Sequence, residues 1–334
     1  MTRRTAAPAP TALARSAPTP TVLRVREPGD ILGVVPYLLG FHPTESLVAA
    51  FVRQRQVVVT ARIDLAATAD VEALVDQLEL VGRQVGSRSV VLIGYSADGG
   101  VRDLMRDLAD VIPLDLVDVL AVSGERWWSV RCDGGCCPPE GRPYDIASHP
   151  LAAAAVVAGI SATATRQEVA DLAAGPPAAD QDRLSGLAEQ TARRLAGMGR
   201  RRRRQRMRRQ VGRTLRSGGP TEAEAIEIAV LARDVVVRDA AWILMSREHA
   251  ADHVALWRRV VSVSVWPCEA APLGMLAMAG WLSGNGALLN CCIERLERVA
   301  PEYSLLQLCR EISDQAVPPS HYDAIAEEMR AAFG

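Results

Sequence analysis

Hydrophobic and polar positions near the start of the chain predict a short helix followed by a hairpin. GDILGVVPYLLG (29–40) is apolar at helical spacing, and Gly40 and Pro43 end it. SLVAAFV (46–52) and VVVTARIDL (57–65) have strand character, and the polar RQRQ between them predicts a turn. Arg62 and Asp64 are two positions apart, so we expect both side chains on one face of the second strand.

Strand and helix patterns then alternate. An apolar stripe at helical spacing begins near Asp70 and predicts a helix, and VVLIGY (90–95) predicts a buried strand after it. A second helix with an apolar stripe is predicted over 101–111. Two further strands follow, LDLVDVLAV (114–122) and WWSVRC. This alternation predicts right-handed crossovers. We therefore expect an α/β domain with a mixed, mainly parallel sheet that carries an antiparallel hairpin.

The second half of the chain is helical in pattern. AAGPPAADQD (173–182) predicts a linker, a long helix then ends at SGGP (217–220), and Thr221 with Glu224 forms a capping-box signature. The predicted organisation is a disordered tail at 1–21, an α/β domain at 22–165, a linker and long basic helix at 166–217, and an all-α helical domain at 218–334.

Composition limits the partners. The net charge of −1 excludes a global polyanion-binding signature, so any basic patch must be local. Seven cysteines, an odd number set mostly in apolar helical patterns, do not suggest a disulfide framework. The first residues lack a secretory signal, and no apolar run is long enough to span a membrane. We expect a cytoplasmic protein without membrane contact.

Four segments occur in order: VPYLLGFHPTESLVAAF, TARIDL, WWSVRCDGGCCPPEGRPYD and MAGWLSGNGALLNCCIERLERVAPEYSL. From about Val22 to Pro319 the chain resembles the actinobacterial domain-of-unknown-function family numbered 4192. The resemblance implies a cytoplasmic actinobacterial protein and no particular activity. Members of that family often have one more residue between the first cysteine and the cysteine pair, which weakens a strict metal geometry here.

The cysteine-rich loop allows three interpretations. Cys132 and Cys136 have the spacing of structural zinc knuckles, with Cys137 and His149 as the remaining candidate ligands. Zinc is thus a possible cofactor, although no second cysteine pair follows. Redox chemistry would need an exposed thiolate with a low pKa. A hairpin tip whose small cysteines pack under a tryptophan is the third interpretation, and the one we favour.

The segment GFHPTES contributes the main candidate site. His42, Glu45 and Ser46, together with Arg62 and Asp64, could line one cleft as catalytic residues, but the GxSxG pattern of hydrolases is absent. The ligand-binding candidates are Tyr37, His42, Arg62, Asp64, Tyr144 and Asp145. Arg62 and Asp64 could equally form a structural ion pair.

Two other segments suggest sites. The arginine-rich helix 200–216 could neutralise nucleic-acid phosphates through Arg201, Arg204 and Arg208, although it has no aromatic residue for base stacking. His249 and His253 are one helical turn apart, as in zinc proteases, but Ala250 replaces the general-base glutamate. For both segments the alternative is an ordinary amphipathic or solvated helix.

Three hypotheses of function follow. The first, which we favour, is a non-catalytic binding or regulatory module for a small ligand or a protein. The second is an enzyme, a hydrolase or a thiol- or metal-dependent one, that uses the cleft of His42, Glu45, Arg62 and Asp64. The third is a nucleic-acid-associated protein that binds through the Arg200–Arg216 helix.

Overall fold

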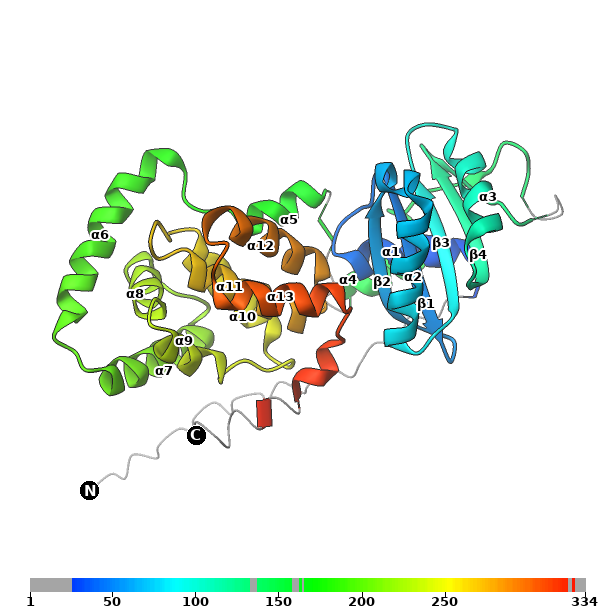
Figure 1. The fold of residues 1–334 in the computed structure, drawn as a ribbon. Coiled ribbons are helices and arrows are strands. Elements are labelled where there is room, and N and C mark those ends of the chain that lie inside the picture. The colour runs from blue at the N-terminus through cyan, green and yellow to red at the C-terminus, as the bar shows by residue number, and fades with distance from the viewer. Residues whose placement is uncertain (1–25, 133–136, 158–161, 164, 324–325, 328–334) are drawn as a thin grey trace, which may run out of the picture.

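The chain folds into a sheet-containing part followed by a helical part (Figure 1). Between them in the sequence come α4 (Pro150–Val157), which contacts α1, and α5 (Arg166–Leu172), which contacts α12. The computed structural model describes residues 26–132, 137–157, 162–163, 165–323 and 326–327. The predicted tail at 1–21 and Cys136 lie outside these residues.

The first part contains a six-stranded mixed sheet of order β2-β1-β3-β4-β5-β6. Its strands are β1 (Ser46–Arg53), β2 (Gln56–Asp64), β3 (Ser89–Tyr95), β4 (Asp115–Ser123), β5 (Arg126–Ser129) and β6 (Arg142–Pro143). Among these six described strands, only β3 and β4 pair in parallel, and the other neighbouring strands are antiparallel.

The expectation of a mainly parallel sheet is therefore wrong. The strand β2, the helix α2 (Val71–Val85) and the strand β3 do form a crossover, but β1 lies between the two strands. Because β1 runs antiparallel to both neighbours, it replaces the parallel pair that simple alternation predicts. Only the crossover through α3 (Val101–Val111) joins adjacent parallel strands.

Local signals explain the hairpin and the first helix. Gln54 and Arg55 both have positive φ, at 50° and 64°, which suits a two-residue turn between twisted strands. The helix α1 (Pro28–Leu39) ends at Gly40, whose φ of 84° gives the left-handed cap that the sequence predicts. The hairpin and the helix are thus confirmed.

The two faces of the sheet pack against different layers. One face, with Leu47, Leu92 and Val119, packs on α2 and α3. The other face, with Val48, Ile93 and Leu120, packs on α1, and its apolar cluster continues into the helical part. The sheet is therefore covered on both faces, and α1 lies on the face that shares a core with the helices.

The second part is helical. Its elements are α6 (Ala178–Ala196), α7 (Arg200–Ser217), α8 (Glu222–Ala232), α9 (Val235–Trp242), α10 (Ala250–Val261), α11 (Ala270–Leu282), α12 (Gly286–Val299) and α13 (Ser304–Asp314). Every residue of α11 is buried except Ala270, so this helix forms the centre. The single long helix predicted before SGGP is in fact α6 and α7, since Gly197 and Gly199 interrupt it.

The loop after α1 contacts the helical part directly. A Cβ atom on Gly40 would lie 3.2 Å from the side-chain nitrogen of Asn285, the residue that caps the start of α12. Phe41 also forms a bridge with Thr163, and the backbone N–H of His42 donates to the Thr163 carbonyl over 3.1 Å. The predicted GFHPTES loop is thus held between the two parts.

Candidate functional site

Ser46, Arg62 and Asp64 meet at one corner of the sheet. Ser46 pairs with Asp64 across β1 and β2, and the Arg62 Nε donates to the Ser46 Oγ over 2.8 Å. The Arg62 guanidinium lies 2.6 Å from an Asp64 carboxylate oxygen. The sequence expectation that Arg62 and Asp64 share a face is confirmed, and the two form an ion pair.

The hydroxyl of Ser46, the candidate nucleophile, is engaged in hydrogen bonds. Ser46 is 0 % exposed, and its hydroxyl donates to the Thr44 carbonyl over 2.5 Å while it accepts from Arg62. No hydrogen bond joins it to His42 among the described residues. His42 is half-buried, and this burial lowers the pKa of its imidazole below the usual 6.5.

Glu45 is directed towards a different loop. Its carboxylate accepts from the Ser96 hydroxyl, at 2.9 Å and 3.1 Å, and from the Ala97 N–H at 2.8 Å. Its own backbone has a φ of 43°, a conformation that is uncommon outside glycine. Glu45 therefore fastens the turn after β3 and has no contact with the Arg62–Asp64 pair among these hydrogen bonds.

Tyr144 and Asp145 lie elsewhere, in a hollow of about 410 Å³ between α1 and the β5–β6 edge. The Tyr144 ring lies 6.4 Å from that of Tyr95, and burial raises the pKa of Tyr144. Hydrogen bonds from Ser148 and Ala147 hold the pKa of Asp145 below its usual value. Tyr37 is half-buried on α1 and does not line this hollow. The predicted ligand residues therefore do not form one site: Tyr144 and Asp145 line this hollow, whereas Arg62 and Asp64 pair with each other on β2.

The proposed zinc ligands stay a prediction. Cys132 and Cys137 are both partly buried, but Cys136 lies outside the described residues. Within the described ranges, no group of three or more His, Cys, Asp or Glu side chains could hold a metal ion. The His149 Nδ1 accepts from the Leu151 N–H over 3.2 Å, and its Nε2 lies 3.5 Å from Asp30.

His253 is a core residue. It is 0 % exposed, its Nε2 lies 3.1 Å from the Leu244 carbonyl oxygen, and His249 is exposed. Burial lowers the pKa of His253, so the unfolded chain binds a proton more readily than the folded one.

Stability should therefore fall as the pH drops below 6.5, the usual pKa of the side chain. When the pH is lowered from about 7.5 to about 5.5, the free energy of unfolding should fall by up to about 1.4 kcal/mol more in the wild type than in the His253→Leu variant. Urea unfolding at both pH values measures this difference. The control His249→Leu should retain the wild-type dependence, and a His253→Leu variant that also retained it would contradict the prediction.

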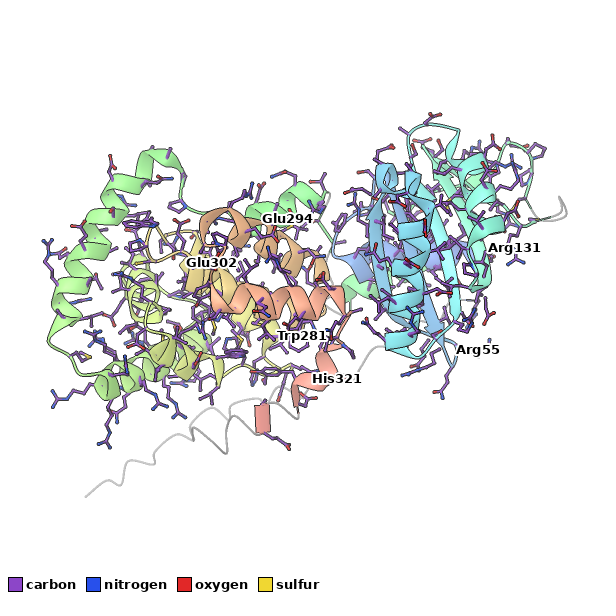
Figure 2. All side chains as sticks on the ribbon, in the orientation of Figure 1. Arg55, Arg131, Trp281, Glu294, Glu302 and His321 are labelled. Carbon is purple, nitrogen blue, oxygen red and sulfur yellow. The ribbon has the colours of Figure 1, made fainter. Side chains whose placement is uncertain are left out.

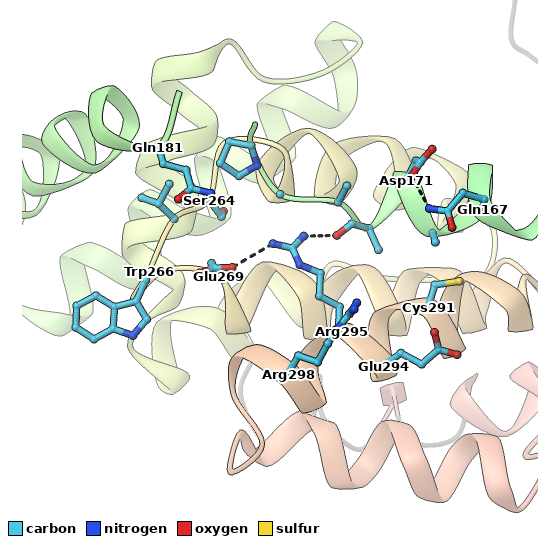
Figure 3. A pocket seen from close by; sticks show the side chains of 16 residues that line it. Gln167, Asp171, Gln181, Ser264, Trp266, Glu269, Cys291, Glu294, Arg295 and Arg298 are labelled. Atoms are coloured by element: carbon cyan, nitrogen blue, oxygen red, sulfur yellow. Dashed lines mark hydrogen bonds and ion pairs between the residues drawn. The ribbon is translucent and has the colours of Figure 1, made fainter. Parts of the chain in front are cut away.

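A pocket that the sequence did not indicate lies in the helical part (Figure 3). The cavity of about 400 Å³ is bounded by the α5–α6 connection, the segment 264–269 and one face of α12. Trp266 lies at its edge and is 79 % exposed. An exposed tryptophan beside a cavity is typical of a binding surface, because its large apolar ring is otherwise buried.

Arg295 holds the pocket together. Its guanidinium donates to the carbonyl of Ala173 on one side and lies 3.1 Å from Glu269 on the other (Figure 3). Burial lowers the pKa of Arg295, and Glu269 opposes that effect. Burial also raises the pKa of the Cys291 thiol in the same wall, which keeps this thiol protonated and unreactive.

The charges of the pocket do not all cancel. Glu269 is paired with Arg295, and Glu294 with Arg166. Asp171 and Arg298 have no ion pair among the described residues, although Asp171 accepts from the Gln167 amide over 3.0 Å. Figure 3 shows Asp171 on the α5 side and Arg298 on the α12 side. The pocket therefore has one carboxylate and one guanidinium that could pair with charges of a ligand.

Sequence reasoning missed this pocket because its walls are far apart in the chain. Residues 167–181 meet residues 264–298 only in the folded protein. The one local signal was Trp266, which stands between the alternating VSVSV run and Pro267.

Comparisons with known proteins give a family and no function. A family model described as "Domain of unknown function (DUF4192)" matches residues 28–320. Neither the curated proteins nor the solved structures gave a match. No helix in the described ranges has both the length and the apolar character needed to cross a bilayer.

Proposed function

This chain belongs to the DUF4192 family, and we propose that it is a non-catalytic binding module whose ligand is a small zwitterion, an amino acid or short peptide. The observation that carries the proposal is the pair of uncompensated charges, Asp171 and Arg298, in one cavity beside the exposed Trp266. A ligand ammonium suits the carboxylate, a ligand carboxylate suits the guanidinium, and an apolar side chain suits the indole.

The volume supports a ligand of this size. About 400 Å³ lies within the range of small-molecule sites, and the amides of Gln167 and Gln181 add neutral hydrogen-bonding groups. The nucleophile candidates do not favour catalysis, since Ser46 is buried in hydrogen bonds and the pKa of the Cys291 thiol is raised. We also propose a cytoplasmic location, because Cys268, Cys291, Cys292 and Cys309 are free buried thiols.

The test is a thermal-shift and calorimetric screen of free amino acids and dipeptides, each paired with its N-acetylated and C-amidated analogue. We expect at least one zwitterion to raise the melting temperature and its blocked analogues to bind more weakly. Because each charge-assisted hydrogen bond contributes about 1.5–3 kcal/mol, Arg298→Gln and Asp171→Asn should each weaken binding about tenfold or more.

Arg310→Gln is the matched control, since it removes one exposed arginine that pairs with Glu297 on the neighbouring helix and does not line the pocket. It should bind as the wild type does. Failure of the whole panel at millimolar concentration, or Arg298→Gln and Asp171→Asn variants that both bind as tightly as the wild type, would reject the proposal.

A further inference from the structure

One face of α7 carries a row of arginines, and none of them forms an ion pair with an acidic residue in the described part of the chain. The opposite face packs into the core through Met207, Gln210, Val211 and Thr214. The outward residues include five exposed arginines: Arg201, Arg202, Arg208, Arg209 and Arg216. Figure 2 shows nitrogen-tipped side chains projecting from α7 away from the other helices.

Four of the other five arginines of α7 have structural partners, and the fifth, Arg204, is half-buried, which sets the exposed five apart. Arg200, Arg206 and Arg213 form ion pairs with Asp234, Glu227 and Glu224. Arg203 donates to the carbonyls of Leu195 and Ala196 at the end of α6. The predicted nucleic-acid residues divide accordingly, because Arg201 and Arg208 are exposed while Arg204 is half-buried with its Nε enclosed.

Helical spacing gathers the five side chains into one stripe. Arg201 and Arg208 are seven residues apart, as are Arg209 and Arg216, so each pair is separated by two turns on one face. Residues 200–217 contain no aspartate or glutamate to reduce this charge. From Arg201 to Arg216 the stripe is about 22 Å long, which corresponds to about six or seven base pairs of a duplex.

The composition of the stripe indicates which polyanion fits. No aromatic residue occurs in α7, so stacking on single-stranded bases has no support. The apolar Met207 and Val211 are both 0 % exposed, so the helix lacks the free apolar face with which amphipathic helices enter membranes. Arginine matches phosphate oxygens well and needs no base contact to do so.

We propose that the outward face of α7 binds the phosphate backbone of duplex nucleic acid without reading its sequence. This surface is separate from the pocket beside Trp266, and none of the five arginines lines that pocket. The duplex and the zwitterion would therefore contact different residues.

The test is fluorescence anisotropy of a labelled 20-base-pair DNA duplex over a salt series. If five phosphates are neutralised, affinity should fall about 500-fold between about 50 and 200 mM salt, a slope of about −4.5 on logarithmic axes. The fivefold variant with Gln at 201, 202, 208, 209 and 216 should lose this binding. A milder variant, Arg208→Gln with Arg209→Gln, should reduce the slope by about 2.

The control is a fivefold Arg→Gln variant with the same net charge but with the changes outside α7, at the exposed Arg55, Arg83, Arg106, Arg247 and Arg310. It should bind the duplex as the wild type does. Equal loss in the control, unchanged binding by both α7 variants, or tighter binding to the single strand or to anionic phosphatidylserine vesicles than to the duplex would overturn the proposal.

Discussion

Replacing both Arg194 and Arg206 by alanine should lower the free energy of unfolding by about 3–5 kcal/mol. Both guanidiniums bind Glu227, whose side chain is only 6 % exposed. Arg206 donates to both carboxylate oxygens, at 2.5 Å and 2.8 Å, and Arg194 donates to one at 2.8 Å. Without them, Glu227 on α8 becomes a buried charge with no counter-ion, and desolvation of that charge dominates the loss.

Urea unfolding followed by circular dichroism measures this effect. Either single variant leaves Glu227 with one counter-ion, so each should lower the free energy of unfolding by about 1 kcal/mol. The double variant Arg201→Ala with Arg208→Ala removes the same number of arginines from the exposed stripe and should change stability by no more than about 0.5 kcal/mol. Equal losses in the two double variants would contradict the division of these arginines into structural and exposed sets.

This division also shows why arginine count is a poor guide to function. In the sequence, residues 200–216 form one dense run, from which Arg201, Arg204 and Arg208 were predicted to bind phosphate. The fold pairs Arg200, Arg206 and Arg213 with acidic residues of the segment 224–234, and these contacts position α7. Only the tertiary partners reveal which charges remain available.

Local signals predicted most of the helices and strands. Gly40, Asp70 and Thr221 each mark a helix end through a short-range effect, namely a left-handed cap or a side-chain oxygen that accepts from the first turn. The order of strands depends instead on which strand β1 joins, and no local pattern encodes that choice. We expected more parallel pairs than the sheet contains because the sequence did not indicate that β1 pairs antiparallel with β3.

The sites show the same limit. The sequence suggested that His42, Glu45, Ser46, Arg62 and Asp64 could line one cleft. Of these, Ser46, Arg62 and Asp64 do meet, because a hairpin fixes their register over a short distance in the chain. Glu45, although next to Ser46, binds Ser96 some fifty residues later. The pocket beside Trp266 depends on contacts between segments about a hundred residues apart, which one sequence cannot specify.

Replacing Arg295 by methionine should lower the free energy of unfolding by about 3–5 kcal/mol, the other large effect that we expect. The side chains of Arg295 and Glu269 are only 15 % and 19 % exposed, so the substitution leaves Glu269 largely buried without its counter-ion. It also removes the donor to the carbonyl of Ala173, a residue that is 1 % exposed. The methionine fills much of the same volume, so the lost charge pair and hydrogen bond account for most of the change.

Adding Glu269→Met to this variant separates the two causes. Because a buried ion pair can be replaced by apolar side chains at little cost, the double variant should recover most of the lost stability. Urea unfolding of the wild type, both single variants and the double variant completes the cycle, and we expect a coupling of about 2 kcal/mol or more. If the double variant is as unstable as Arg295→Met alone, the bond to Ala173 rather than the charge of Glu269 holds the α5–α6 connection against α12.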